Sequence, residues 1–214
     1  FVGQSISVDT ACSSVLVAIH QAQQALNNGE IDVAVIASAN LLLTPEIFVA
    51  LTKMGSVSPS GKTKAFDENA DGYVRGEGAS VLVLKRREDA EYNNDNIEII
   101  IKSAAVKHNG TSNGFTAPNP QVQVDTIKTA LSNANLSVDS IDYVEVHGIG
   151  NRYTDAMEVQ AIHQAYKNRQ RPIQVGSVKS NIGHLEACTG MPMLFKIIAA
   201  MQNKIIPAQI HLHE

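Results

Sequence analysis

The sequence predicts an α/β fold, because strand-like apolar runs alternate with helical stretches along the chain. The run Val33–Ala37 has no polar alternation, as expected of a parallel strand that is covered on both faces. Residues 88–96 form the most hydrophilic stretch, and their composition predicts an exposed connection. We place a boundary in this stretch, which gives two βαβ-rich halves at residues 1–92 and 93–214.

The first half combines apolar strands with one buried helix. A strand-like run extends from Val2 to Val8, and the helix expected at Ser13–Leu26 carries an apolar stripe too broad for a surface helix. A long strand is expected at Ile31–Leu43 and a shorter one at Ala79–Leu84. Between these strands, residues 56–78 are rich in Gly, Ser, Asp and Asn and predict a polar loop, a candidate lining for a site.

The second half repeats the alternation of strands and helices, which implies parallel βαβ units with right-handed crossovers. In chain order we expect strand Ile97–Val106, helix Val122–Asn133, strand Ile141–Val146, helix Asp155–Lys167, strand Ile173–Val178, helix Thr189–Gln202 and strand Ile205–Ile210.

Composition and charge exclude several classes of function. The chain has 214 residues, of which 44% are hydrophobic and 18% charged, as in an ordinary globular protein with a sizeable core. Its net charge of −4 provides no basic field for nucleic acid or for an anionic membrane surface. No apolar run approaches the roughly 18 residues that span a bilayer. We therefore expect neither nucleic acid nor a membrane as a partner.

The cysteines and the chain ends indicate the setting of the protein. Cys12 and Cys188 are too few for a disulfide framework, and no C-x-x-C pair is present, so a reducing cytoplasm is the simplest localisation. Phe1 opens directly in a strand-like run without a starting Met, and the chain stops just after an apolar segment. We expect an excised piece of a larger fold, incomplete at both ends.

Cys12 is the leading candidate for a nucleophile. It lies where the first strand-like run gives way to the helix Ser13–Leu26, so it faces the positive end of the helix dipole and unpaired backbone N–H groups. Both features favour the thiolate over the thiol. The alternative is a cysteine that only packs in the core, and histidines converging on the sulfur would decide between the two.

Two of the seven histidines lie past the carboxyl ends of expected parallel strands, where open α/β sheets gather their ligand sites. His147 follows the strand Ile141–Val146, and His184 follows the strand Ile173–Val178. Glycines beside both histidines let the backbone turn sharply and let a ligand approach. Two neutral imidazoles that donate N–H to one oxygen would stabilise an enolate or a tetrahedral oxygen, with Cys12 as the third member of the site.

Other motifs are weaker. The Gly-Ile-Gly triplet after the first of these histidines lacks the third glycine of a dinucleotide-binding fingerprint. The carboxylates Asp67, Asp71 and Glu77 fit no calcium loop, so we expect a solvated turn and no metal. Lys179 is either an exposed lysine or a residue that orients a histidine or a carboxylate through a charge-assisted contact.

Four segments stand out in order along the chain. They are Val8–Ser14 (VDTACSS), Ala65–Gly78 (AFDENADGYVRGEG), Thr116–Asn119 (TAPN) and Ser177–Glu186 (SVKSNIGHLE). Together they resemble the β-ketoacyl synthase (ketosynthase) domain of modular type I polyketide synthases. The match runs across all 214 residues and covers about the middle half of a domain that typically exceeds about 400 residues.

The resemblance implies a thiolase-like layered fold and the homodimer that is usual in the family. Cys12 would carry the acyl chain as a thioester taken from the phosphopantetheine arm of an acyl carrier protein, with no cofactor bound directly. His147 and His184 would hold the oxygen of a malonyl thioester while decarboxylation forms the carbanion that attacks the Cys12-bound acyl group. Lys179 and Glu186 would support this site. The expected contacts of the pantetheine arm are Ile149, Asn151 and Asn181. Further expected partners are other polyketide synthase domains, in cis or in trans.

Two positions depart from the family pattern. The family usually has His-Gly-Thr-Gly-Thr, whose threonines contact the pantetheine arm, and this chain has Ile149 and Asn151 there. Asn151 is able to replace one hydrogen bond, whereas Ile149 is not. The family's C-terminal Gly-Phe-Gly-Gly loop and the N-terminal part of its first half lie outside these residues, so we expect the chain alone to be inactive.

The sequence therefore predicts an acyltransferase that elongates a chain by decarboxylative Claisen condensation in polyketide biosynthesis. A ketosynthase that only passes the acyl chain between carriers is the nearest alternative: the substituted Ile149 and Asn151 favour it, and the retained His147 opposes it. A noncatalytic dimerisation or gatekeeping domain is a third possibility, but a scaffold needs neither Cys12 nor the two histidines.

Overall fold

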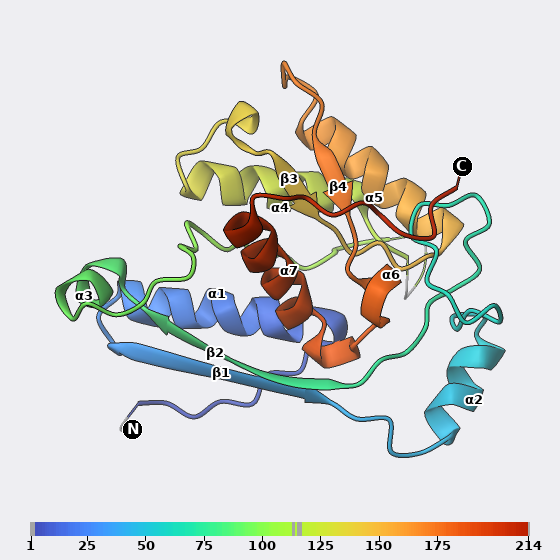
Figure 1. Ribbon diagram of the computed structural model, residues 1–214, viewed down its shortest axis with the longest axis horizontal. Coiled ribbons are helices and arrows are strands. Elements are labelled where there is room, and N and C mark those ends of the chain that lie inside the picture. The colour runs from blue at the N-terminus through green and yellow to red at the C-terminus, as the bar shows by residue number, and fades with distance from the viewer. Residues whose placement is uncertain (1–2, 113, 115–116, 214) are drawn as a thin grey trace.

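The computed structural model describes residues 3–112, 114 and 117–213, and contains two small sheets with helices around them. In Figure 1 one sheet lies at the bottom and the other at the top, with helix α7 (Gly190–Asn203) between them. Val2, in the first expected strand, and Thr116, in one of the four motifs, lie outside the described residues.

The lower sheet consists of β1 (Val33–Asn40) and β2 (Gly78–Lys85), which pair antiparallel. Val35 and its partner Val83 are 50% and 63% exposed, whereas Ile36 on the opposite face is buried. The expectation of a parallel strand covered on both faces is therefore wrong at this position. An unbroken run of small and β-branched residues also fits a strand that leaves valines on its outer face, so the run alone did not distinguish the two arrangements.

Helices α1 (Ser14–Asn27) and α7 cover the inner face of this lower sheet (Figure 1). The buried residues of this core are Val15, Ile19, Ile36, Leu185, Cys188 and Met191. Each fully buried aliphatic side chain contributes about 1.5–3 kcal/mol of transfer free energy. The core thus joins the beginning of the chain to its end and brings the start of α1 against the segment around residue 188.

The upper sheet is the parallel pair β3 (Tyr143–Glu145) and β4 (Gln174–Gly176), as expected from the sequence. Helices α4 (Pro120–Asn133) and α5 (Arg152–Ala165) pack on each other beside it (Figure 1). Their contact is a small second core of Val124, Ala161 and Ala165.

Several short elements were not expected. Helix α2 (Glu46–Lys53) lies where no element was predicted, and α6 (Lys179–Ile182) lies between a predicted strand and a predicted helix. Helix α3 (Arg87–Tyr92) lies where an exposed connection was predicted. The short 3-10 helices are η1 (Ala11–Ser13), η2 (Val138–Ser140) and η3 (Glu186–Cys188).

Three segments expected as strands join no sheet among the described residues. They are Ile97–Val106, Ile205–Ile210 and the run that ends at Val8. A strand requires a neighbouring backbone for its N–H and C=O groups, and within residues 3–112, 114 and 117–213 none pairs with these segments. These segments are apolar, as a strand would be, but an apolar run forms a strand only where a neighbouring backbone pairs with it.

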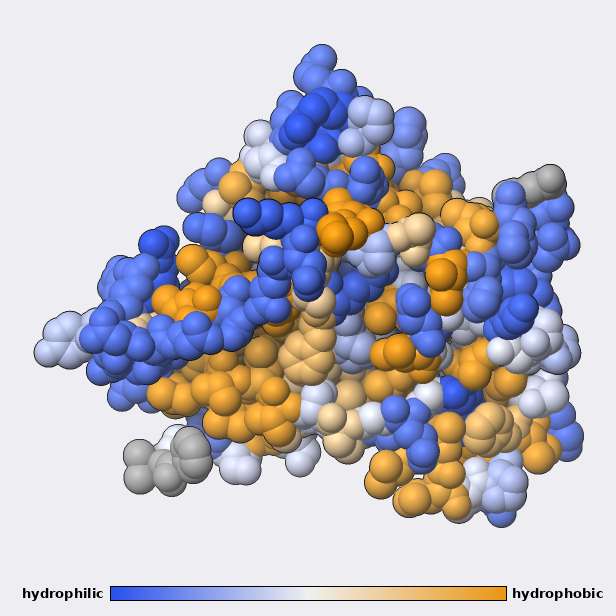
Figure 2. Space-filling view, viewed as in Figure 1, coloured by the Kyte–Doolittle hydropathy of each residue, from blue (hydrophilic) through white to orange (hydrophobic). Residues whose placement is uncertain are grey.

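Hydrophobic side chains also reach the surface. Figure 2 shows them gathered over the lower sheet and around α2, where the exposed residues include Leu41, Leu43, Ile47, Val49 and Met54. In the part of the chain that the structure describes, no helix has the length and apolar character that a membrane span requires.

Candidate active site

Cys12 lies in a tight turn between the N-terminal segment and α1. The turn is η1 (Ala11–Ser13), in which Ala11 has a left-handed φ of 54°, a conformation that costs a residue with a Cβ about 1–2 kcal/mol. Side chains hold this turn: Asp9 Oδ1 accepts from the N–H of Ala11 at 3.0 Å, and Ser14 Oγ donates to the carbonyl of Ala11 at 2.6 Å. The thiol is thereby presented at the start of the helix, where it is partly exposed.

His184 follows α6 and Gly183, whose φ is 78°. A Cβ at Gly183 would lie 2.8 Å from the carbonyl oxygen of Val74, so glycine is required there. The N–H of His184 donates to the Val74 carbonyl at 2.7 Å, and its own carbonyl accepts from the N–H of Gly76 at 3.0 Å. The side chain emerges from this pairing into the interior and is only 1% exposed.

The imidazole of His184 is held at both nitrogens. Its Nε2 lies 3.1 Å from Cys12 Sγ. Its Nδ1 accepts from the N–H of Glu186 at 3.1 Å, and the Thr189 hydroxyl lies 2.7 Å from the same nitrogen. Because a backbone N–H can only donate, the neutral ring carries its proton on Nε2. That N–H points at the sulfur.

His147 follows β3 and faces His184. The two ring centroids are 5.6 Å apart and the ring planes meet at 87°. The carboxylate of Glu158 accepts from the N–H groups of His147 and Gly148 at 2.7 and 2.8 Å. Lys179 Nζ donates to the carbonyl of His147 at 2.6 Å. His147 is therefore held through its main chain.

The loop after His147 is folded around Asp155. This carboxylate is 3% exposed and accepts from the N–H groups of Phe66, Ile149 and Gly150, each at 3.0 Å. Burial raises the pKa of Asp155, and these backbone N–H groups oppose the rise. The contact ties the loop that carries His147 to the segment around residue 66.

Both imidazoles are neutral at physiological pH. Burial lowers the pKa of His147 to about 3, with Lys179 and His184 acting in the same direction. Burial also lowers the pKa of His184 to about 3, helped by Lys179 and Arg75. The pKa of Lys179 falls to about 8 because of burial, against the attraction of Glu158 and other carboxylates. The site thus contains two neutral N–H donors beside a buried cation.

Cys12 differs from the sequence expectation in one respect. Burial raises the pKa of its thiol above the ordinary 9.0, although Lys179 and a backbone N–H lower it in part. The expected preference for the thiolate at rest is therefore wrong. Removing the sulfur from water opposes its ionisation more than the helix start and the nearby cation favour it.

A cavity of about 330 Å³ opens beside Cys12. Its walls combine apolar and polar side chains, namely Asp9, Ala11, Cys12, Asn40, Ile47, Leu51, Tyr73, Glu186 and Ala187. Helix α2 supplies the apolar wall through Ile47 and Leu51. The space is large enough to hold a small organic group next to the sulfur.

Two family models match this chain, one after the other. Residues 1–90 match the beta-ketoacyl synthase N-terminal domain, and residues 99–213 match the beta-ketoacyl synthase C-terminal domain. The chain belongs to the beta-ketoacyl synthase family. The resemblance inferred from the four sequence motifs is confirmed.

Curated relatives of this ketosynthase are large polyketide synthases. One phenolphthiocerol/phthiocerol polyketide synthase polypeptide of Mycobacterium tuberculosis is 43% identical over 98% of this chain and 11% of its own length. Polyketide synthase GfsA of Streptomyces halstedii is 42% identical over 99% of this chain and 3% of its own length. The chain therefore spans about a tenth or less of these relatives.

Solved ketosynthase structures share the fold. The ketosynthase from module 6 of the bacillaene synthase of Bacillus subtilis superimposes with a TM-score of 0.93 at 40% identity, covering 96% of this chain and 37% of that one. An oxazolomycin ketosynthase domain from Streptomyces albus gives a TM-score of 0.96 at 36% identity, covering 100% of this chain and 38% of that one. The thiolase-like ketosynthase fold is confirmed.

The remaining predicted site residues lie around this centre in different ways. Glu186 lines the cavity, and its Oε1 accepts from Arg75 Nε at 2.5 Å. Asn151 caps α5, since its Oδ1 accepts from two backbone N–H groups of the first turn at 3.1 Å. Ile149 is partly exposed on the loop held by Asp155, and Asn181 is exposed on α6. Neither lines the cavity at Cys12.

Sequence reasoning missed the buried groups that support the site. Asp155 and Glu158 lie in the first two turns of α5, and their spacing after the Asn151 cap was the available signal. Tyr73 contacts His184 edge to face at 5.0 Å, and Arg75 pairs with Glu186. These two contacts join segments more than 100 residues apart, and no local pattern encodes such pairings.

The polar loop is more buried than expected. Asp67 is 3% exposed and accepts from backbone N–H groups, and Asp71 pairs with Lys64 at 2.8 Å, so the expectation of a solvated turn is wrong for Asp67. Among the described residues, no three His, Cys, Asp or Glu side chains come together as a metal site. These carboxylates stabilise the loop instead.

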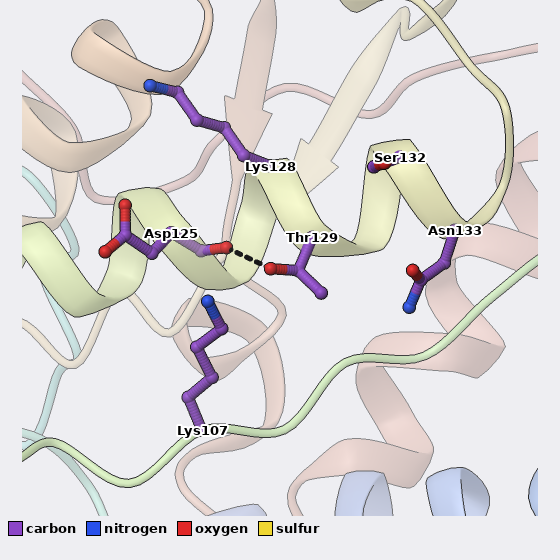
Figure 3. A pocket seen from close by; sticks show the side chains of 6 residues that line it. All are labelled: Lys107, Asp125, Lys128, Thr129, Ser132 and Asn133. Atoms are coloured by element: carbon purple, nitrogen blue, oxygen red, sulfur yellow. Dashed lines mark hydrogen bonds between the residues drawn. The ribbon is translucent and has the colours of Figure 1, made fainter.

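A second hollow, of about 320 Å³, lies between α4 and Lys107. Figure 3 shows it lined by polar side chains, with the Thr129 hydroxyl bonded to the Asp125 carbonyl. It shares no residue with the cavity at Cys12.

Proposed function

We propose that this chain carries the catalytic centre of an elongating ketosynthase, which joins a Cys12-bound acyl group to a malonyl-type unit with loss of CO2. The observation that carries the proposal is the meeting of three groups: Cys12 Sγ lies 3.1 Å from His184 Nε2, and the ring of His147 faces that of His184. A nucleophile beside two neutral N–H donors suits acyl transfer followed by carbanion formation.

In the first step Cys12 takes the acyl group. The sulfur attacks the carbonyl carbon of an acyl thioester, a C–S bond forms to Cys12, and the bond to the carrier's thiol breaks. The proton of Cys12 passes to the departing thiol, so the step is neutral overall. The raised pKa of Cys12 means that the proton is lost as the substrate engages rather than beforehand.

In the second step a malonyl thioester enters. Its carbonyl oxygen accepts N–H from His184 and from His147, which stabilises the enolate left when the bond to the carboxylate breaks and CO2 departs. The electron pair on the α-carbon then attacks the acyl carbonyl on Cys12. A C–C bond forms, the C–S bond breaks, and the thiolate of Cys12 takes up a proton from the solvent, the one proton that decarboxylation consumes overall. The product, still on its carrier, is longer by two carbons.

Lys179, together with burial, keeps both imidazoles neutral, so that each ring has one N–H to donate. Its cation lies beside His147 and contributes to lowering the pKa of each histidine, so neither ring takes up a proton that would have to be lost again. Such preorganised donors require little rearrangement during the reaction.

The proposed partners follow from the family. The curated relatives are polyketide synthases, which supports an acyl carrier protein with a phosphopantetheine arm as substrate carrier and other synthase domains as neighbours. A ketosynthase homodimer is part of the same proposal.

A second function, transfer without elongation, is favoured by one feature. Ile149 offers no hydroxyl, and Asn151 uses its side-chain oxygen to cap α5. If the pantetheine arm of the extender carrier needs donors at these positions, the acyl group would load on Cys12 and move on without condensation.

The test is mass spectrometry on a complete ketosynthase domain that contains this chain. The domain is given an acyl thioester and then malonyl-loaded carrier protein, with Cys12→Ala as the control. The proposal predicts an acyl adduct on Cys12, followed by a carrier-bound product longer by two carbons. An adduct that passes to the carrier without extension would establish the transfer-only function, and the absence of an adduct would contradict both.

A further inference from the structure

Arg75 is a buried cation with no part in the reaction steps above. Its side chain is 2% exposed, and its Nε donates to Glu186 Oε1 at 2.5 Å. The guanidinium carbon lies 4.5 Å from the centre of the Phe48 ring on α2, and Nη1 has no partner among the residues that the structure describes. Arginine is rarely buried to this degree without an anionic partner. Glu186 is that partner.

Glu186 connects Arg75 to the reacting histidine. Its backbone is left-handed, with φ of 45°, which is unusual for a residue with a Cβ. Its N–H, which lies in the peptide plane shared with Leu185, reaches His184 Nδ1 at 3.1 Å. The contact determines the tautomer, because Nδ1 can accept this bond only if the ring proton is on Nε2. The left-handed φ sets the direction of the Glu186 side chain, which reaches Arg75.

The segment that carries Arg75 also braces the main chain of His184. Val74 and Gly76, on either side of Arg75, exchange hydrogen bonds with the backbone of His184 at 2.7 and 3.0 Å. The same short stretch therefore acts on His184 in two ways. Its backbone fixes the main-chain position of His184, and the guanidinium of Arg75 holds Glu186, the residue whose N–H contacts the imidazole ring.

We propose that Arg75 is a positioning residue for His184: by holding the side chain of Glu186 in place, it keeps the Glu186 N–H on Nδ1, so that Nδ1 stays an acceptor and the Nε2–H stays directed at Cys12. The inference rests on the proposed function only for its effect on rate. Without Arg75 the ring exchanges between tautomers, and the form with an unprotonated Nε2 offers no donor to a thioester oxygen.

The first test reads the tautomer directly. In a complete ketosynthase domain containing this chain, with ¹⁵N-labelled histidine, the His184 signals are assigned by their loss in His184→Gln. The wild type is expected to show a protonated Nε2 and an accepting Nδ1. Arg75→Gln is expected to give a mixture of tautomers. Arg86→Gln is the matched control, since Arg86 also makes ion pairs, with Asp32 and Asp89, but contacts no residue of the site. It should leave the tautomer unchanged.

The second test distinguishes an effect of Arg75 on the position of His184 from an effect on the stability of the fold. Arg75→Gln is expected to slow the release of CO2 from malonyl-carrier by about 10- to 100-fold, as for a misplaced catalytic group, with folding checked by thermal melting. Arg75→Lys keeps the charge and should recover part of the rate. If Arg75→Gln does not fold, Glu186→Ala, which removes the side chain that Arg75 holds and keeps the backbone N–H, takes its place.

A single Nε2–H tautomer in Arg75→Gln, or in Glu186→Ala where that replaces it, would overturn the inference. A mixture that appears equally in Arg86→Gln would do the same, because it would reflect general loosening of the fold. If the wild type releases no CO2 at all, the proposed function fails, while the nitrogen signals still decide the role of Arg75.

Discussion

Both histidines of the site are held through their main chain, but His184 is also held at its ring. His184 is fixed at its ring, with Nε2 at the sulfur of Cys12 and Nδ1 at the N–H of Glu186. His147 is fixed at its main chain, where Glu158 accepts its N–H and Lys179 donates to its carbonyl. The first arrangement determines which nitrogen carries the proton. The second fixes the backbone position of His147.

The difference suggests a division of labour within the proposed reaction. His184 contacts the nucleophile and must present one defined N–H both to the sulfur and to the incoming thioester. In the proposed reaction His147 needs only to reach the same oxygen. His184, the residue with two partners in the proposed reaction, thus has ring contacts in addition to its main-chain contacts.

The largest expected effect separates the two histidines by half-reaction. Replacing either by alanine should slow the release of CO2 from malonyl-carrier by about 10²- to 10³-fold, the usual effect of losing one donor to a developing oxyanion. His184→Ala should also slow the loading of Cys12, whereas His147→Ala should load it at nearly the wild-type rate. Adduct formation by mass spectrometry and CO2 release are measured on the same preparations. An equally slow loading of Cys12 in both variants would contradict the proposed difference in role between the two histidines.

A second prediction compares Glu158, which holds the main chain at His147, with Thr189, which contacts the ring of His184. Glu158→Gln removes one of two acceptors for buried N–H groups beside His147 and should lower the free energy of unfolding by about 1–3 kcal/mol. Thr189→Val removes only the hydroxyl near Nδ1 of His184 and should cost about 0.5–1.5 kcal/mol. Urea denaturation of both variants checks the order. A larger loss for Thr189→Val would mean that the ring contact, and not the main-chain contact, dominates stability.

Both histidines should make stability fall in acid. A histidine whose pKa drops from 6.5 to about 3 on folding binds fewer protons in the folded than in the unfolded state between these values. The free energy of unfolding is therefore unaffected above pH 6.5 and decreases below it, by up to about 1.4 kcal/mol per pH unit for each histidine. The double variant His147→Ala, His184→Ala should show a shallower decline. An unchanged slope in that variant would assign the acid sensitivity to other groups.

The smallest expected effect concerns the nucleophile at rest. Because burial raises the pKa of Cys12 above 9.0, its alkylation by iodoacetamide should rise with pH to a midpoint above that value. Peptide mapping distinguishes Cys12 from the buried Cys188. A midpoint below neutral pH would instead restore the thiolate expected at the start of a helix.

The three residues that meet at the candidate site were easier to predict from the sequence than their supports. Cys12, His147 and His184 each adjoin a sharp backbone turn and lie at an element boundary, which local patterns reveal. Asp155 and Glu158 were not found, because a carboxylate satisfied by backbone N–H groups looks in sequence like any acidic residue near a helix start. Their role depends on where a distant loop folds.

The fold shows the same limit. The helices α1, α5 and α7 follow from their apolar periodicity to within a few residues. The pairing of β1 with β2 was misjudged, since the same valine-rich run suits an exposed face as well as a buried one. Helix α2 was missed although Pro45 and Glu46 form an ordinary helix start, so that signal was present in the sequence.

The most direct measurement follows the carboxyl carbon and the product together. A complete ketosynthase domain containing this chain is loaded at Cys12 and given malonyl-carrier labelled at the free carboxylate, and released CO2 and extended product are counted in one sample. We predict one labelled CO2 for each product longer by two carbons, with both lost in the double variant His147→Ala, His184→Ala. Transfer of the acyl group with no labelled CO2 released would contradict the account.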